Sequence, residues 1–157
     1  MRKRASDKRT ASLLMAGVFL AGASLPAWAD RVDDLIRKLQ SDAAADRRQA
    51  ALEIGRARDP RAVSPLIALL RDPEPLVRLD ASGALMEIGK PAVNPLIDAV
   101  KVDPDAVFLW NAIRVLEEIG DPRALEALRA ILKNHTDPSV QQIARYAVEK
   151  LERLQKP

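Results

Sequence analysis

The sequence predicts an all-α protein whose helices stack as an α-solenoid of four helix-turn-helix repeats. Ala, Leu, Arg and Glu are abundant in a chain of 157 residues in which aromatic side chains make up 3%, a balance that suits helices better than sheets. An Ile-Gly pair recurs three times, at intervals of 34 and 31 residues. Each pair follows a stretch whose apolar residues are spaced as on one face of an α-helix.

The first 29 residues have the layout of a secretory leader. A basic stretch over residues 1–10 precedes an apolar run over residues 11–23, and Ala27 and Ala29 place small residues where a signal peptidase reads them. The apolar run has 13 residues, whereas a membrane-spanning helix needs about 20. We therefore expect cleavage after Ala29, a periplasmic or secreted location and no stable membrane span in the mature chain. An uncleaved anchor or a buried helix is the alternative.

The formal charge of +3 reflects this leader. The first 29 residues contain five basic side chains and one acidic side chain, so the rest of the chain carries a formal charge of −1. The basic isoelectric point is therefore no argument for a nucleic-acid partner, and we expect none. The sequence contains no cysteine, which excludes disulfides, thiolate metal sites and thiol nucleophiles within it.

First helices are predicted at the start of each repeat, and their apolar residues fall in matching columns. These residues are Val32, Leu35, Ile36 and Leu39; Ala62, Val63, Leu66, Ile67, Leu69 and Leu70; Ala92, Val93, Leu96, Ile97, Ala99 and Val100; and Ala124, Leu125, Leu128, Ile131 and Leu132. Pro65 and Pro95 lie inside two of these helices, where an interior proline is expected to cause a bend.

Second helices carry the clearest pattern, with apolar residues at i, i+4, i+7, i+8 and i+11. The stripes of repeats two, three and four are Val77, Ala81, Ala84, Leu85 and Ile88; Phe108, Ala112, Val115, Leu116 and Ile119; and Val140, Ala144, Ala147, Val148 and Leu151. In repeat one, Ala43, Ala50, Ala51 and Ile54 fit, but Arg47 aligns with Ala81. We interpret repeat one as a degenerate end unit, which lacks a neighbour on one side.

Glycine and Asp-Pro pairs mark the predicted helix ends. Gly55, Gly89 and Gly120 each follow an isoleucine, and glycine past a helix end adopts the left-handed conformation without a Cβ clash. Aspartate caps a helix N-terminus, and a proline after it has no N–H to leave unpaired. Two Asp-Pro pairs are therefore expected to open first helices and three to open second helices; the aspartates are Asp59 and Asp121, and Asp72, Asp103 and Asp137.

The segment DPRAVSPLIALLRDPEPLVRLDASGALMEIG, residues 59–89, resembles a HEAT repeat of the short type found in phycobilisome lyases. The same pattern recurs in register from residue 30 to about residue 154. The resemblance implies a right-handed, armadillo-like superhelix in which first helices lie outside and second helices line a concave inner face. It also implies a binding scaffold. We expect one domain over residues 30–157, with repeats at about 30–55, 59–89, 90–120 and 121–154.

Candidate catalytic or metal-binding residues are sparse. His135 is the single histidine, and we interpret it as a turn residue before a helix capped by Asp137, with a metal site as the alternative. HEAT-type hydroxylases carry paired His-Glu dipeptides for two irons, and this sequence has no His-Glu. It also has no phosphate-binding glycine loop and no local signature of Ser-His-Asp catalysis. We predict no enzyme activity, no cofactor and no metal.

The second helices are predicted to present a partner-binding surface beside their core stripes. Trp110 aligns with Leu79, and tryptophan, tyrosine and arginine are enriched at interface hot spots. We therefore predict an apolar patch rimmed with cations that holds a protein or peptide segment, for which an acidic one is a candidate. The predicted binding residues are Arg78, Leu79, Met86, Trp110, Arg114, Arg145 and Tyr146. We expect six further residues to face the same way: Ser82, Leu109, Ile113, Glu117, Gln141 and Gln142.

Other interpretations stay open. Trp110 could be core between repeats three and four, and the arginines could pair with Glu87, Glu117 or Glu118 on solvated helix faces. A function as an assembly factor or chaperone-like partner of another exported protein is the alternative to a scaffold, and a bilin-lyase-like enzyme is a third hypothesis. The alanines at residues 43–45 give repeat one a thin helix face through which the chain could form a homo-oligomer.

Overall fold

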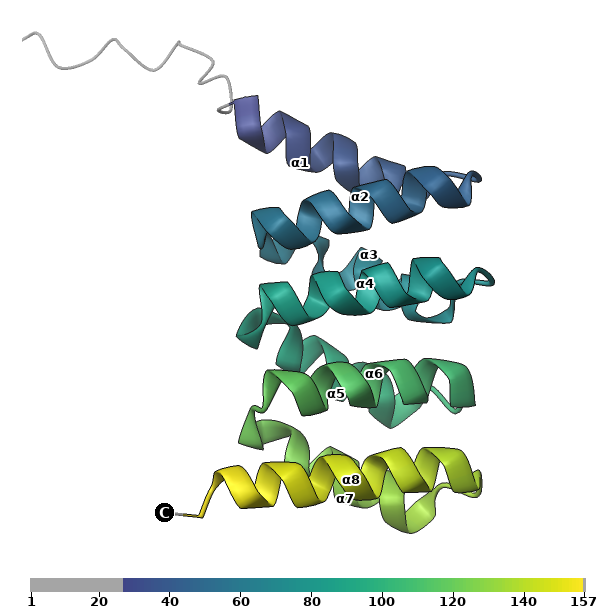
Figure 1. Ribbon diagram of the computed structural model, residues 1–157, viewed down its shortest axis with the longest axis vertical. Coiled ribbons are helices and arrows are strands. Elements are labelled where there is room, and N and C mark those ends of the chain that lie inside the picture. The colour runs from purple at the N-terminus through teal and green to yellow at the C-terminus, as the bar shows by residue number, and fades with distance from the viewer. Residues whose placement is uncertain (1–26, 157) are drawn as a thin grey trace, which may run out of the picture.

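The structure is a computed structural model that describes residues 27–156, and these residues form a stack of paired helices (Figure 1). The α-helices are α1 (Ala27–Lys38), α2 (Ala44–Ala57), α3 (Val63–Ala68), α4 (Pro75–Ile88), α5 (Val93–Val102), α6 (Ala106–Ile119), α7 (Leu125–Asn134) and α8 (Pro138–Leu154). Short 3-10 turns flank the first helices: η1 (Pro60–Ala62), η2 (Leu69–Arg71), η3 (Lys90–Ala92) and η4 (Pro122–Ala124). This confirms the predicted all-α solenoid.

Second helices form one layer and the first helices of repeats two to four form the other, while α1 lies above α2 at the end of the stack (Figure 1). In Figure 1, α2, α4, α6 and α8 lie one below another toward the viewer, and α3, α5 and α7 lie behind them. Each second helix contacts the next one in the stack: α2 contacts α4, α4 contacts α6, and α6 contacts α8. The predicted leader lies outside the described residues except for its last three, because α1 begins at Ala27. Among residues 27–156, no helix combines the length and the hydrophobicity that are needed to cross a membrane.

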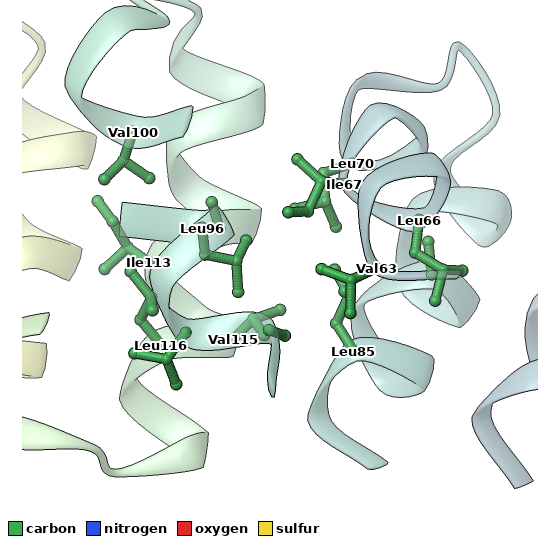
Figure 2. Packing of buried hydrophobic residues seen from close by; sticks show 14 of the residues in the cluster. Val63, Leu66, Ile67, Leu70, Leu85, Leu96, Val100, Ile113, Val115 and Leu116 are labelled. Carbon is green, nitrogen blue, oxygen red and sulfur yellow. The ribbon is translucent and has the colours of Figure 1, made fainter. Parts of the chain in front are cut away.

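One hydrophobic core runs through the whole stack. The predicted stripes of α4, α6 and α8 are buried, apart from Ile119, which is half-buried. First helices contribute the other side; Figure 2 shows Val63, Leu66, Ile67 and Leu70 of repeat two close to Leu85 of α4. Since each pair also packs on its neighbours, stability comes from contacts within and between repeats.

The first repeat follows the same register as the others, which corrects the predicted alignment. Helix α2 does not end at Gly55 but continues to Ala57, and the left-handed residue that ends it is Arg58, with a φ of 53°. Gly89 and Gly120 hold the equivalent positions after α4 and α6, with φ of 74° and 72°. The three residues Arg58, Gly89 and Gly120 are therefore spaced by 31 residues each time. The prediction failed because a left-handed arginine leaves no compositional signal.

Gly55 instead lies where α2 and α4 approach each other closely. It is buried, and a Cβ atom added to it would lie 2.9 Å from the Cα atom of Ala84 and 3.2 Å from the Cβ atom of Ala84. Atoms in ordinary van der Waals contact lie about 3.5–4.0 Å apart, so a side chain at this position would push the two backbones apart. Gly55 is thus a packing residue between repeats one and two.

The corrected register makes Arg47 the counterpart of Arg78 rather than of Ala81. The Arg47 guanidinium donates to the carbonyl oxygens of Ser41 and Asp42 at 2.9 Å each. That of Arg78 donates to the carbonyl oxygens of Asp72 and Pro73, at 2.6 and 3.1 Å. Both arginines therefore tie the start of a second helix to the loop that precedes it.

Arg47 also links repeat one to repeat two. Its Nε and Nη2 atoms donate to the two carboxylate oxygens of Asp72 at 2.7 and 2.8 Å, and both side chains are largely buried. Burial opposes the charge of Asp72, but the hydrogen bonds from Arg47 prevail and hold the pKa of this carboxyl below its usual value. Pairs of this bidentate kind fix geometry as well as energy.

Helix starts follow the Asp-Pro pairs with one correction. Asp59, Asp121 and Asp137 accept from the backbone N–H groups that open η1, η4 and α8, as predicted. The N-caps of α4 and α6, however, are Glu74 and Asp105. The predicted caps of these two helices stand two residues earlier, because a further loop residue separates each Asp-Pro pair from its helix.

These loop aspartates, Asp72 and Asp103, share their place in the repeat with Ser41 and His135. Each of the four side chains accepts a hydrogen bond from the backbone N–H two residues further on, at 2.9–3.2 Å. His135 is therefore a turn residue, as predicted, and its Nδ1 atom is the acceptor. Within residues 27–156, no three His, Cys, Asp or Glu side chains gather in a way that could hold a metal ion.

Pro65 and Pro95 do not lie in helix interiors. A 3-10 turn precedes α3 and α5, and each proline is the third residue of its α-helix. N–H groups in the first turn of a helix have no intrahelical partner, so proline is tolerated there. The predicted bend is therefore replaced by a change from 3-10 to α-helical geometry ahead of each proline.

Candidate functional site

A groove of about 410 Å³ opens between α4 and α6, on the layer of second helices. Its lining consists of Pro75, Arg78, Leu79 and Ser82 from α4, Ala106, Val107, Trp110, Asn111 and Arg114 from α6, and Ser139 from α8. We call this feature the α4–α6 groove. Four of the seven predicted binding residues line it: Arg78, Leu79, Trp110 and Arg114.

Trp110 and Leu79 form the apolar part of the groove together with Val107. Leu79 is 54% exposed, Val107 48% and Trp110 39%. Leu79 and Trp110 are 31 residues apart, so the repeat register places them at equivalent points of neighbouring helices. Trp110 is therefore a surface residue between repeats two and three. The alternative interpretation, in which Trp110 is a core residue between repeats three and four, was wrong.

Arg114 lies one helical turn beyond Trp110, and its guanidinium carbon is 5.0 Å from the centroid of a Trp110 ring. This cation–π contact is favourable because the ring face is electron-rich. Stacking of this kind orients the guanidinium plane without consuming its N–H donors. The groove therefore contains a cation that is held in place and still able to donate hydrogen bonds.

The polar residues of the groove fix its walls. Asn111 donates from Nδ2 to the carbonyl oxygens of Leu70 and Val107, at 3.1 and 2.8 Å, and thereby joins α6 to the preceding repeat. Ser82 donates from its hydroxyl to the carbonyl oxygen of Arg78 at 2.8 Å. No buried side-chain polar atom of the described residues lacks a hydrogen-bond partner. The groove is thus preformed, which lowers the entropic cost of binding.

The other predicted binding residues lie elsewhere. Met86 is half-buried against the core, and Arg145 and Tyr146 are exposed on α8, outside the groove lining. Whether these three residues bind a partner stays a prediction. The expectation that Leu109, Ile113 and Glu117 face outward was wrong, since they are 1%, 0% and 8% exposed. They are buried because α6 packs on α4 and α8 as well as on α5.

The expected pairing of the groove arginines with nearby glutamates was also wrong. Glu87 binds Arg58 at 2.6 Å. Lys150 of α8 binds Glu117 and Glu118, at 2.5 and 3.2 Å, and the hydrogen bond that it donates to Glu117 raises the pKa of Lys150. These ion pairs connect neighbouring second helices, and the sequence gives no sign of them because the partners are about 30 residues apart.

Five lining residues were not predicted as site residues: Pro75, Ala106, Val107, Asn111 and Ser139. All but Asn111 are the first or second residue of a second helix, where the groove begins, and Asn111 is the sixth residue of α6. Val107 precedes Trp110 by three residues, which places it on the same face of the helix. That spacing was a usable signal for Val107.

A second hollow, of about 520 Å³, lies at the N-terminal end of the stack. It is lined by Arg31, Val32, Leu35, Glu53, Arg56, Ala57 and Asp59. Its charged groups are largely paired already, since Arg31 binds Glu53 at 2.8 Å and Asp59 binds Arg61 at 2.9 Å. The α4–α6 groove contains an exposed tryptophan and two arginines that form no ion pair within the described residues, and is the better candidate.

An α-solenoid built from stacked helix pairs is the architecture of a helical-repeat protein. A family model described as HEAT repeats matches residues 32–116 and 92–149, and the chain belongs to this family.

Several curated proteins are similar to part of the chain. An uncharacterized phycocyanin operon protein Z from Pseudanabaena tenuis is 32% identical over 91 residues, which cover 57% of this chain and 45% of that protein. The bilin biosynthesis protein PecF from Nostoc is 33% identical over 94 residues, covering 57% and 54%. The deoxyhypusine hydroxylase of Rattus norvegicus is 35% identical over 77 residues, covering 48% and 26%. The chain thus spans about a quarter to about half of each relative.

Proposed function

We propose that this chain is a binding scaffold that holds a segment of a protein partner in the α4–α6 groove. The observation that carries the proposal is the exposure of Trp110 and Leu79 side by side in a preformed groove. Burial of a large apolar side chain contributes about 1.5–3 kcal/mol, so an exposed tryptophan is a strong potential anchor for a partner. Membership of the HEAT-repeat family supports a role in protein interaction.

Affinity capture with matched variants tests this proposal. Tagged wild-type protein, Trp110→Ala and Tyr146→Ala are each used to capture proteins from the cells that make the chain, with mass spectrometry as the readout. Tyr146 is the control because it is an exposed aromatic residue of the same layer outside the groove. Loss of a hot-spot residue costs about 2 kcal/mol or more, so Trp110→Ala should weaken binding of the partner about 30-fold and lower its recovery.

Equal recovery of every captured protein by wild type and Trp110→Ala would contradict binding through the groove. A partner lost with Tyr146→Ala and retained with Trp110→Ala would move the binding surface to α8. Circular dichroism of each variant checks that the helices are intact.

We propose further that the chain is exported. The support is the order of basic stretch, apolar run and small residues in the first 29 residues. N-terminal sequencing of protein recovered outside the cytoplasm should begin at Asp30. Recovery only in the cytoplasm, with residue 1 intact, would contradict export. Cleavage after Ala29 also requires that the first turn of α1, which starts at Ala27, is open when the peptidase acts.

An assembly factor for another protein is the second candidate function. The similarity to PecF, whose name assigns it to bilin biosynthesis, supports this candidate or a lyase-like activity. The present sequence has no cysteine and cannot itself hold a bilin through a thioether. Mixing the purified protein with a free bilin and recording visible absorbance tests the pigment version. An unchanged bilin spectrum would exclude it and leave the scaffold.

A further inference from the structure

The α4–α6 groove carries positive charge and no negative charge of its own. Two of its ten lining residues are arginines, Arg78 and Arg114, and none is aspartate or glutamate. The sequence after residue 29 has a formal charge of −1, so the groove departs from the average charge of the chain. A cluster of one sign in a concave surface attracts partners of the opposite sign and disfavours others.

Arg114 is not neutralised by its own helix. Glu117 and Glu118 are three and four residues further along α6, within reach in principle, but Lys150 binds both. No ion pair joins Arg114 to a carboxylate anywhere in residues 27–156. Its guanidinium is oriented by the ring of Trp110, so its N–H donors are available to a ligand that lies on the indole.

Arg78 has donors to spare as well. Only its Nη1 atom donates within the described part of the chain, to the carbonyl oxygens of Asp72 and Pro73. The carboxylate of Asp72 is held by Arg47, and that of Asp80 is held by Arg48 at 2.7 Å. Two acidic groups near Arg78 are therefore occupied by other arginines, and no ion pair within the described residues joins Arg78 to Glu74, four residues before it.

The apolar strip and the two guanidinium groups lie in one groove. A ligand that fits both must carry an apolar side chain for Trp110 and Leu79, with carboxylates on either side of it. Such a carboxylate accepts two hydrogen bonds from a guanidinium in a fork-like geometry, which gives direction as well as strength.

We infer that the α4–α6 groove binds an acidic peptide segment, in which an aliphatic or aromatic side chain packs on Trp110 and Leu79 while flanking Asp or Glu side chains pair with Arg114 and Arg78. This inference names the partner chemistry of the proposed scaffold and rests on that function.

Selection from a random peptide library tests the inference. A phage-displayed library of 12-residue peptides is panned on the full chain and on Arg114→Glu. On wild type, selected peptides should contain Asp or Glu next to an apolar residue several-fold more often than the starting library does. On Arg114→Glu this excess should disappear, and Lys or Arg should be enriched instead.

Affinity of one selected peptide gives the second measurement. Hydrogen bonds to charged groups contribute about 1.5–3 kcal/mol, so Arg114→Ala should weaken its binding about 10- to 100-fold. Arg153→Ala, which removes an exposed arginine outside the groove and outside the predicted binding residues, should change the affinity less than twofold. Raising the salt concentration should weaken binding to wild type more than it weakens the residual binding of Arg114→Ala, in which only the pair with Arg78 remains.

Several results would overturn the inference. The selection would do so if it enriched no peptides, or if it enriched apolar or basic peptides that lack acidic residues. The affinity measurement would do so if wild type and Arg114→Ala bound the selected peptide equally well. If the capture experiment nevertheless shows a partner that depends on Trp110, the scaffold function stands and the acidic preference alone fails. Circular dichroism of the arginine variants separates a lost contact from a lost fold.

Discussion

The close approach of α2 and α4 at Gly55 can be tested against a glycine with no such neighbour. Gly83 lies inside α4, and a Cβ atom added to it meets nothing within 4 Å. Alanine stabilises a helix interior by about 1 kcal/mol relative to glycine, so Gly83→Ala should raise the free energy of unfolding by about that amount. The same gain in helix propensity applies to Gly55→Ala, because both glycines are helical.

Gly55→Ala nevertheless should destabilise the protein. Its new Cβ atom would lie 2.9 Å from a backbone atom of Ala84, and a backbone cannot move aside as a flexible side chain can. Overpacking of this kind costs about 1–3 kcal/mol, which outweighs the propensity gain for most of that range. We expect a net loss of about 1 kcal/mol, and therefore a difference of about 2 kcal/mol between the two variants.

Urea unfolding followed by circular dichroism at 222 nm measures both free energies. The two variants serve as controls for each other, since they make the same chemical change in neighbouring second helices. If Gly55→Ala is as stable as Gly83→Ala, then α2 and α4 are not packed as closely as described. In that case the register that places Arg58 at the end of α2 would lose its strongest packing argument.

Further predictions concern charge. Hydrogen bonds from Arg123 lower the pKa of Asp121 from 3.8 to about 2. Ionised Asp121 therefore stabilises the folded state above pH 4, by at most about 2 kcal/mol. This stabilisation is lost as the pH falls from 4 to 2. Urea titrations over this range should decline less steeply for Asp121→Asn, and an unchanged decline would contradict the assignment. Arg47→Ala should cost about 3 kcal/mol by leaving Asp72 buried without its cation. Arg37→Ala, which removes an exposed pair, should cost less than about 0.5 kcal/mol in the same assay, and similar losses for both would refute the difference in burial.

The sequence was sufficient to predict the fold and the core of repeats two to four. Periodicity alone located stripes such as Val77 to Ile88, because a helix that packs on one side repeats its apolar residues every three or four positions. It failed in repeat one, where Ile54-Gly55 imitates a helix end. The role of Gly55 depends on Ala84, 29 residues away, and only the packed structure shows that neighbour.

The candidate site was predictable where it follows the repeat register and unpredictable where it depends on neighbouring repeats. Leu79 and Trp110 were found because they occupy equivalent positions. Leu109 and Ile113 were misplaced because a single stripe assumes one buried side, whereas a second helix in a stack is also covered by the helices before and after it. Lys150 was missed as a partner for Glu117 for the same reason.

The shared register of the second helices has a consequence for how specificity can change. Leu79 and Trp110 belong to a row that continues as Arg48 in α2 and Gln142 in α8, with one residue per repeat. Gln142 is exposed and Arg48 is partly so, whereas the core stripes of the same helices point inward. Substitutions along this row can lengthen, shorten or recharge the surface offered to a ligand while the residues that hold the stack together stay as they are. Ligand recognition and folding therefore depend on different positions of the same repeat.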